Sequence, residues 1–465
     1  MTTTRRTLIA VAAASLFAAL AFAPLHVAAQ GGSRIAIRGA KIVTGAGATI
    51  DSGTIVMRDG LIESVAAGGN APADATVIDG AGLTVYPGLI DMANGTVLDM
   101  PAPESAGATA ARGAAPAAGG RGGRGAETET YADLERAKRA QILRPDFEAA
   151  EVVRYEGPEL ARLASAGITS VLAVPTAGLF RGQSALINVA APASGPEVST
   201  VGRDRHGLVV VKAPVAEHVT FDPGRGGGPN AYPGSLLGVV AFIRQSFYDA
   251  VWQRDARAYY TRHADAPRPA FEPALDALAP ALAGKMPVAF DAAEEREILR
   301  ALGLAKEFSL DPIIVGGLEA SSVIDDLRAV KARVIYSVNF QAGGRGGGPG
   351  ADVPIRTMHL AQNAPTVPAA LDKAGIVFAF TSAGLARPAD FVRNVARTVK
   401  EGGLPADAAL RALTSNAAKI AGVGDRLGTI EKGKIANLLV TEGDLFDNGR
   451  VRYVFVDGRS VSVGQ

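Results

Sequence analysis

The segment YPGLIDMANGT, residues 86–96, is where an apolar strand pattern meets a group of polar residues. The apolar residues before Asp91 indicate a buried strand, and Asp91, Asn94 and Thr96 follow toward its carboxyl end. In α/β folds with parallel strands, catalytic and binding groups gather at that end of the sheet. The segment therefore predicts one strand of such a fold and part of its candidate site.

The middle of the chain, residues 83–422, alternates short apolar segments with helical patterns. Such alternation predicts parallel strands covered by helices. The strands are expected at 168–174, 208–211, 287–290, 312–315, 333–338 and 376–380, and the helices at 236–260, 294–308, 320–331, 388–402 and 405–414. A (β/α) barrel is favoured over a doubly wound sheet, because no GxGxxG motif follows a strand and no P-loop is present.

The two ends of the chain, unlike the middle, show short alternating strands. They are expected at 34–43 and 54–65 before the barrel and at 436–441 and 451–463 after it, with hairpin turns at Asp59-Gly60 and Asp457-Gly458. We predict a composite β-sandwich domain from residues 30–86 and 425–465, and a barrel from residues 87–424 with Gly/Arg-rich loop insertions.

Composition excludes several kinds of site. The chain of 465 residues has a net charge of +1, which provides no long-range attraction to nucleic acid or to anionic membranes. Cysteine is absent, so disulfides, thiolate zinc sites and a cysteine nucleophile are excluded.

Residues 1–29 have the pattern of an export signal. Arg5-Arg6 precede the apolar run 8–23, and Val27-Ala28-Ala29 offers small residues for cleavage. The arginine pair also fits a twin-arginine signal, although ordinary secretory signals often carry two arginines. Because no later stretch is long and apolar enough to cross a bilayer, we expect no stable membrane span. The mature protein is predicted to start near Gln30 and to be periplasmic or secreted.

Three glycine-rich segments, 102–127, 224–229 and 343–350, interrupt the predicted barrel. Runs of glycine bury too little apolar area to fold alone, so mobile loops near the substrate-facing end of the barrel are expected. An RGG-type nucleic-acid segment is the alternative. Export, a nearly neutral charge and the absence of interleaved aromatic residues argue against it, so no nucleic-acid partner is expected.

Two segments resemble the amidohydrolase superfamily. Residues 86–91 resemble its first barrel strand, and LRALTSNAAK (410–419) with GTIEKGKIANL (428–438) resembles its C-terminal signature. Their order and spacing match as well, so the resemblance covers nearly all of the mature chain and is nearest to the imidazolonepropionase-like and dipeptidase-like branch. It implies a distorted (β/α)8 TIM barrel that binds one or two divalent metal ions, usually zinc, and hydrolyses C–N bonds.

The resemblance also implies a set of metal ligands. They are a His-x-His after the first strand, a carboxylated Lys or a Glu from the fourth, a His each from the fifth and sixth, and an Asp after the eighth that shuttles the proton. Zinc needs three or four N or O donors, and it lowers the pKa of its bound water to about 7. In this chain those positions hold Ala93 and Gly95, Asp291, the pair at 315–316 and Ser382, while Lys212 is the one lysine considered for the fourth strand. The usual metal site is predicted to be missing, and no resident cofactor is expected.

The histidines lead to the same expectation without any alignment. His26 falls in the signal, and His206, His218, His263 and His359 form no pair at i, i+2 or i, i+4. Structural or surface roles are favoured for all four. His263, for example, is predicted to end a helix, where a positive charge complements the helix dipole.

A few polar residues remain near the predicted barrel mouth. Asp91 is expected to be structural, whereas Asn94, Asp291, Glu319 and Ser382 are candidates for a remnant pocket. The two carboxylates and the amide offer oxygens for weak binding of Ca²⁺ or Mg²⁺, although a solvated cluster is favoured. As a nucleophile, Ser382 lacks a GxSxG context and a histidine to take its proton.

Residues 178–188 follow the second predicted strand and have the pattern of a substrate-facing loop. Arg181 and Gln183 would suit the carboxylate of a peptide-like ligand. A tight turn at Gly182 with solvated side chains is an equally favoured alternative.

Three functions remain open at this point. The first is an exported pseudoenzyme, non-catalytic or impaired, that binds a small-molecule or peptide-like ligand or partners an active paralogue or further copies of itself. The second is an active hydrolase of a C–N bond in a cyclic amide or dipeptide, with a relocated metal or a metal-free mechanism. The third is a binding module that uses the Gly/Arg loops. The stripped ligand set favours the first.

Overall fold

The computed structural model describes residues 34–100, 131–154, 158–189, 210–222, 233–263, 265–340 and 354–461. The expected export signal, the three glycine-rich segments and His206 lie outside these ranges. Within the described ranges, no helix has both the length and the apolar character that a bilayer crossing requires.

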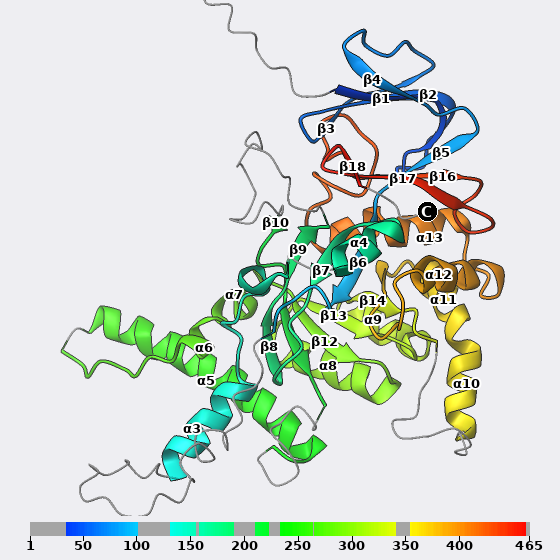
Figure 1. The fold of residues 1–465 in the computed structure, drawn as a ribbon. Coiled ribbons are helices and arrows are strands. Elements are labelled where there is room, and N and C mark those ends of the chain that lie inside the picture. Colours follow the sequence, from blue (N-terminus) through cyan, green and yellow to red (C-terminus); the bar gives the residue numbers. More distant parts are fainter. Residues whose placement is uncertain are drawn as a thin grey trace, which may run out of the picture.

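The two ends of the chain meet in one eight-stranded sheet, seen in the upper part of Figure 1. The order is β18-β17-β16-β5-β1-β2-β3, and β4 pairs with β1. β16 is antiparallel to β5, which joins the C-terminal strands to the N-terminal ones. The strands are β1 (Arg34–Val43), β2 (Thr49–Arg58), β3 (Leu61–Ala67), β4 (Ala75–Asp79), β5 (Leu83–Pro87), β16 (Leu438–Glu442), β17 (Arg450–Val456) and β18 (Arg459–Val461).

A core shared by both chain ends stabilises this sheet. Ile42 and Met57 from the N-terminal strands pack in one cluster with Leu438 and Phe455 from the C-terminal strands. All four side chains are at most 1% exposed. Because burial of apolar area is the main favourable term in folding, neither end supplies this core alone.

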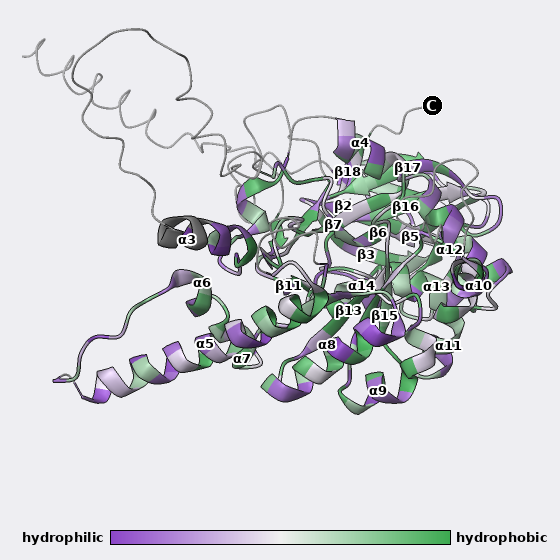
Figure 2. Cartoon of the chain, turned by 90° about the horizontal axis from the view of Figure 1, so that it is seen from below, coloured by the Kyte–Doolittle hydropathy of each residue, from purple (hydrophilic) through white to green (hydrophobic). Residues whose placement is uncertain are grey.

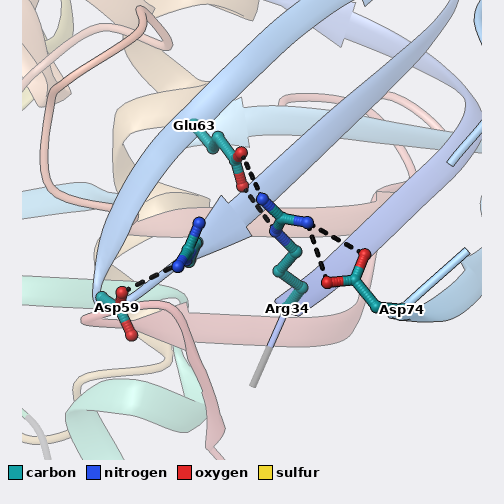
Figure 3. A network of polar contacts seen from close by, with 5 residues as sticks. Arg34, Asp59, Glu63 and Asp74 are labelled. Atoms are coloured by element: carbon teal, nitrogen blue, oxygen red, sulfur yellow. Dashed lines mark hydrogen bonds and ion pairs between the residues drawn. The ribbon is translucent and has the colours of Figure 1, made fainter. Parts of the chain in front are cut away.

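Arg34 links three parts of the sheet at the start of β1 (Figure 3). Its Nε and Nη2 donate to the Glu63 carboxylate of β3 at 3.0 and 2.9 Å. Its Nη1 donates to the Asp74 carboxylate, just before β4, at 2.9 and 2.8 Å. Because these groups are in contact with solvent, the network sets strand positions more than it adds stability.

The barrel strands form two further ladders. The first has the order β10-β9-β7-β6, and the second has the order β15-β14-β13-β12-β11-β8, in which β11 to β15 run parallel. The strands are β6 (Leu89–Asn94), β7 (Ile168–Ala173), β8 (Phe180–Gln183), β9 (Ala185–Asn188), β10 (Val210–Lys212), β11 (Glu217–Thr220), β12 (Val288–Ala292), β13 (Pro312–Gly316), β14 (Arg333–Ser337) and β15 (Phe378–Thr381).

β8 and β9 correct the expectation of a loop at 178–188. They are separated by Ser184 alone and run antiparallel to β11 and β7, so this segment connects the two ladders. The backbone N–H of Ser184 donates to the carbonyl oxygen of Ala216, just before β11, at 2.9 Å. The glycines suggested a loop, but Gly182 instead supplies a φ of +105° at a bulge, where a Cβ would lie 2.3 Å from Phe147 O.

Side chains connect the other edges of the ladders, β6 and β15. Asp91 Oδ1 accepts from Ser382 N at 2.7 Å, and Asp91 Oδ2 accepts from Ser382 Oγ at 2.5 Å and from Asn94 Nδ2 at 2.9 Å. Thr381 Oγ1 donates to Ala93 O at 3.1 Å. We call the group Asp91, Asn94 and Ser382 the Asp91 latch, because it ties the first barrel strand to the last.

Strand alternation separates an inner face from an outer one. Ala289 belongs to the inner cluster and its neighbour Val288 to the outer cluster, which packs against the helices. His218 pairs with Ala289 and Glu217 with Val288. His218 therefore faces the barrel interior, while Glu217 is buried under the helical layer. Burial raises the pKa of Glu217 well above its usual range.

Helices cover the outer face of the strands (Figure 1). The longest, α5 (Leu236–Arg262), extends with α6 (Pro273–Asp276) beyond the body in Figure 2, and its Phe247 packs edge-on against Phe180 of β8. The predicted helices at 236–260, 294–308, 388–402 and 405–414 are confirmed. The other helices are α3 (Tyr131–Ile142), η1 (Ala149–Val152), α4 (Pro158–Ser165), α7 (Ala279–Leu282), α8 (Glu295–Phe308), η3 (Ala320–Val323), α9 (Ile324–Ala329), α10 (Ile355–Asn363), η4 (Ala364–Thr366), α11 (Val367–Lys373), α12 (Asp390–Lys400), α13 (Ala406–Leu413) and α14 (Ser415–Ile420).

Asp91→Ala is expected to destabilise the fold strongly. It leaves the Ser382 N–H, the Ser382 hydroxyl and the Asn94 amide without their buried acceptor, at a cost of roughly 3 kcal/mol or more. Ser382→Ala keeps the backbone bond and should cost about 1–2 kcal/mol. Chemical denaturation measures both. An exposed control, Ser321→Ala, should stay within about 0.5 kcal/mol; equal effects of all three substitutions would contradict the latch.

Glu217→Gln is expected to stabilise the protein increasingly as pH rises. The folded-state pKa of Glu217 lies above its ordinary value of 4.5, so the folded state holds this proton more tightly than the unfolded state. The wild type therefore loses stability as pH rises from that value toward the folded-state pKa, and the neutral amide does not. Melting temperatures of both proteins across this pH range test the point. A constant difference would show that Glu217 does not titrate as inferred.

Candidate functional site

A cavity of about 1510 Å³ opens at the carboxyl ends of the barrel strands. We call it the mouth cavity. Strands β6, β8, β12, β13, β14 and β15 each contribute lining residues, and α4 and the segment after β15 extend its wall. Four residues singled out in the sequence line it together, namely Asn94, Arg181, Asp291 and Ser382.

The Asp91 latch occupies the β6–β15 side of the mouth cavity. Asp91 is fully buried, and burial is the main cause that raises its pKa, while its three hydrogen bonds act in the opposite direction. Asn94 Oδ1 in turn accepts from the backbone N–H and the hydroxyl of Thr96, both at 2.8 Å. The amide of Asn94 is therefore held at both ends.

The two positions that the resemblance assigns to histidines carry no side-chain donor for a metal. Ala93 adopts a left-handed conformation with a φ of 76°. At Gly95, a Cβ would lie 2.4 Å from Thr176 Cγ2, so a larger residue requires Thr176 to move. The local packing thus matches the small residues that the sequence places there.

Arg181 and Asp291 form an ion pair across β8 and β12, facing the mouth cavity. The Arg181 side chain is 10% exposed and that of Asp291 is 34% exposed. Asp291 stands where the resemblance places a fifth-strand histidine. Its carboxylate already faces a cation, which competes with any metal ion for the same oxygens.

Two candidates lie elsewhere. Glu319 accepts from Glu295 N at 2.7 Å and pairs with Arg356 of α10 at 3.1 Å, outside the lining of the mouth cavity. Gln183 Nε2 donates to Pro145 O at 2.9 Å and shares the outer face with its strand partner Glu217. The structure therefore does not join Glu319 to Asp291, or Gln183 to Arg181. Each of these two side chains bonds to a nearer partner instead, Glu319 to Glu295 N and Arg356, and Gln183 to Pro145 O.

The described histidines are scattered. His263 caps α5, as predicted, and stacks on Tyr259 with 4.1 Å between ring centroids. His359 is exposed on α10. Lys212 donates to Ala421 O at 3.0 Å and does not line the mouth cavity.

His218 lies inside the barrel and outside the lining of the mouth cavity. It is fully buried in β11, and neither ring nitrogen has a hydrogen-bond partner. Burial lowers the pKa of His218 well below its usual range, and the charge of Arg181 lowers it further. The alternation in the short segment Glu217–Thr220 was the available signal.

A zinc ion of the kind the resemblance implies does not fit these residues. Both oxygens of Asp91 accept hydrogen bonds, Asp291 is paired with Arg181, and Asn94 and Ser382 are neutral. In the described ranges, no group of three or more His, Cys, Asp or Glu side chains is arranged to hold a metal. Zinc needs three or four available N or O donors, which this cavity does not present.

Comparison with solved structures shows which proteins share the fold. An amidohydrolase from Thermotoga maritima MSB8 is 21% identical with a TM-score of 0.70, and the alignment covers 92% of this chain and 99% of that one. A candidate prolidase from Bifidobacterium longum is 16% identical with a TM-score of 0.51, covering 93% and 95%. A prolidase in complex with N-methylphosphonate-L-proline is 17% identical with a TM-score of 0.51, covering 92% and 99%. No curated protein matches the chain.

These similarities show the (β/α)8 amidohydrolase fold. Residues 235–461 match the sequence model of the amidohydrolase family, a region that runs from the start of α5 to β18. The family match and the shared fold agree with the two segments that carried the resemblance. The chain belongs to the amidohydrolase superfamily.

Proposed function

We propose that this protein is a non-hydrolytic member of its superfamily that binds a small ligand in the mouth cavity. One observation carries the proposal: of the residues at the family's donor positions, Asp291 pairs with Arg181 and Ser382 bonds to Asp91, and the others carry no donor side chain. The Asp91 latch and the Arg181–Asp291 ion pair thus use the carboxylates of Asp91 and Asp291. A cavity of about 1510 Å³ nevertheless remains beside them.

The lining of the mouth cavity suits a ligand with both polar and apolar parts. Val315, Leu318 and Leu385 supply apolar surface, and Asn339 and Arg181 supply polar groups. Small-molecule sites typically combine an apolar lining with a few placed polar groups. The prolidase relative in complex with N-methylphosphonate-L-proline supports a peptide-like ligand for this chain as well.

Location and partners belong to the same proposal. The Arg5-Arg6 pair and the apolar run after it support export to the periplasm or beyond. An active paralogue would supply the chemistry that this site does not support, whereas further copies of this chain would form a homo-oligomer around the ligand sites. Co-purification from the native cell envelope tests that part separately.

A second candidate function rests on the contact between Ser382 and Asp91. The 2.5 Å hydrogen bond from Ser382 Oγ to Asp91 Oδ2 places a hydroxyl against a carboxylate whose pKa is raised by burial. In acyl transfer, Oγ would attack a carbonyl carbon while its proton passes to Asp91, which returns it to the leaving amine. Water would then cleave the acyl-serine ester. The other two bonds to Asp91 favour the structural latch instead.

The metal content of the mature protein tests the principal proposal. The protein is purified without chelator or histidine tag, incubated with zinc, manganese or calcium, and analysed for metal by mass spectrometry. We expect far less than one ion per chain. The reason is that no three available donors converge in the cavity. A metal-dependent amidohydrolase carried through the same steps is the control. About one tightly held ion per chain would overturn the proposal.

Labelling with a fluorophosphonate tests the second candidate. We expect no stoichiometric label on Ser382, because the residue is only 6% exposed and its hydroxyl donates a hydrogen bond to Asp91. The readout is the intact mass and the modified peptide. Ser382→Ala and Ser337→Ala, two serines that line the same cavity, form the matched pair. Labelling that Ser382→Ala alone removes would establish a serine nucleophile.

A further inference from the structure

The longest helix, α5, carries an exposed stripe opposite the side that packs on the body. Its buried residues, which run from Val239 to Gln253, all lie within one half of the helix circumference. On the opposite half, residues spaced alternately three and four apart form a second row. We call this row the α5 seam, and it consists of Gly238, Ala241, Gln245, Tyr248, Trp252, Asp255, Tyr259 and Arg262. The structure describes all of these residues, and none of them is buried.

The α5 seam exposes large aromatic side chains. Trp252 is 62% exposed, Tyr259 is 52% exposed and Tyr248 is 49% exposed. Aromatic residues are enriched in the centres of protein interfaces, and a row of exposed apolar groups on one face typically marks a site of association. The alternating spacing of three and four is also the spacing at which one helix packs along another. The α5 seam therefore has the pattern of a helix-pairing surface.

The second half of the α5 seam lies on a part of the helix that extends beyond the body (Figure 2). α5 has 27 residues, which corresponds to a length of about 40 Å. Its last buried residue is Gln253, so no residue in the range 254–262, all of which the structure describes, is buried. Helices in proteins gain most of their stability from packing an apolar face. The extension gains little from its own body and is available to a second surface.

The residues of the α5 seam are complementary to the same residues in reverse order. With a twofold axis midway between Tyr248 and Trp252, the α5 seam laid antiparallel on its own copy matches position by position. The two smallest residues then face two of the largest, and the Gln245 amide faces the Asp255 carboxylate, to which it can donate. The facing pairs are Gly238 with Arg262, Ala241 with Tyr259, Gln245 with Asp255 and Tyr248 with Trp252.

A parallel arrangement lacks this complementarity. It would place Asp255 on Asp255 and Arg262 on Arg262, and like charges that face each other across an interface are unfavourable. It would also place Gly238 on Gly238, which leaves a gap. The order of residues along the α5 seam thus favours the antiparallel pairing.

We propose that α5 is a dimerisation arm, whose α5 seam packs antiparallel against the α5 seam of a second copy of this chain. The part of α5 beyond Gln253 in each copy covers the half of the α5 seam that lies on the body of the other. A twofold pair of this kind uses the same surface on both copies and is closed. The inference is independent of the proposed function, because it holds whether or not the mouth cavity supports hydrolysis.

The exposed area of the α5 seam is sufficient for a specific dimer. Leu237, beside the seam, is 82% exposed and adds to the three aromatic residues. Since aromatic side chains cover about 150–250 Å² each, these groups on both copies amount to roughly 1,000 Å², near the lower limit for specific interfaces. The polar members of the α5 seam add to this area.

The charge beside the α5 seam also suits a second copy. Gln245 and Trp252 border a groove of about 910 Å³, whose other side includes Arg136 and Arg139 of α3. In the antiparallel pair, Asp255 of the second copy faces Gln245 and so approaches these basic side chains. Complementary charges at the edge of an interface select the partner and fix the register.

Trp252 is the only tryptophan of the chain, so its fluorescence reports the proposed interface directly. Sedimentation velocity and emission of the mature full chain are measured from about 10 nM to about 100 µM, a range that spans common dissociation constants. We expect a dimer at the upper end, with Trp252 emission at shorter wavelength and less quenching by iodide than in the monomer. A monomer at every concentration, or a dimer that leaves the Trp252 signal unchanged, would overturn the proposal. A monomer with a shielded Trp252 would identify another segment of the same chain as its cover.

Two substitutions separate the α5 seam from other exposed apolar positions. Trp252→Glu places a charge at the centre of the pairing and should raise the dissociation constant of the dimer about 100-fold, as measured by sedimentation. Ile355→Glu on α10 is the matched control, because Ile355 is 71% exposed and lies outside the α5 seam. It should leave the dissociation constant within about threefold. Equal effects of the two substitutions would contradict the assignment.

Introduced cysteines test the antiparallel direction, because the chain has none of its own. Chains with Gln245→Cys are mixed with chains that carry Asp255→Cys, and the mixture is oxidised. We expect a disulfide between the two different chains and none within either variant alone. In the antiparallel pair, position 245 and its own copy are about 15 Å apart along the helices, beyond the roughly 7 Å between Cα atoms that a disulfide allows. Efficient linking of either variant with itself would show parallel pairing and overturn the proposed arrangement.

Discussion

The arrangement of this barrel depends on the buried carboxylate of Asp91. It comes from the first barrel strand and accepts two hydrogen bonds from Ser382, which directly follows the last strand. β6 and β15 are the terminal strands of separate ladders, so these bonds and the one from Thr381 to Ala93 connect the edges. A buried charge is tolerated only where hydrogen bonds compensate its desolvation, and this one has three.

The same interactions that close the barrel determine its chemistry. A carboxylate whose oxygens serve three donors is a poor ligand for a metal ion, and Ser382 stands where the resemblance places an acid that shuttles protons. On the far side of the cavity, Asp291 is neutralised by Arg181 rather than by a metal ion. The carboxylates of Asp91 and Asp291, which a hydrolase would direct at a metal ion or substrate, here bond to other groups of the protein. Among the residues that line the mouth cavity, Arg181 keeps its Nε buried without a hydrogen-bond partner.

Sequence patterns predicted most of the regular elements well, but they predicted the segment that forms β8 and β9 poorly. The range 34–43 for β1 and the positions of β7, β12, β13 and β14 followed from apolar runs bounded by turn residues. β8 and β9 were mistaken for a loop, because Gly178 and Gly182 are ordinary loop signals and the segment is short. The φ of +105° at Gly182 and its close approach to Phe147 explain why a glycine is needed inside a strand. The inward direction of His218 could not be read from the sequence for a related reason, since it depends on the register of β11 with β12.

The sequence by itself determined the superfamily and the alternation of strands and helices, and it predicted the loss of the usual histidine ligands, because these are properties of residue identity and local order. It also named Asn94, Arg181, Asp291 and Ser382, which the tertiary structure then gathered around one cavity. Only the tertiary structure decided which of them touch. Asp91 bonds to a residue 291 positions away. Asp291 pairs with Arg181 and not with Glu319, the residue that the sequence suggested beside it. Such pairings depend on strand order and register across the whole barrel, where a shift of one residue turns a side chain to the opposite face.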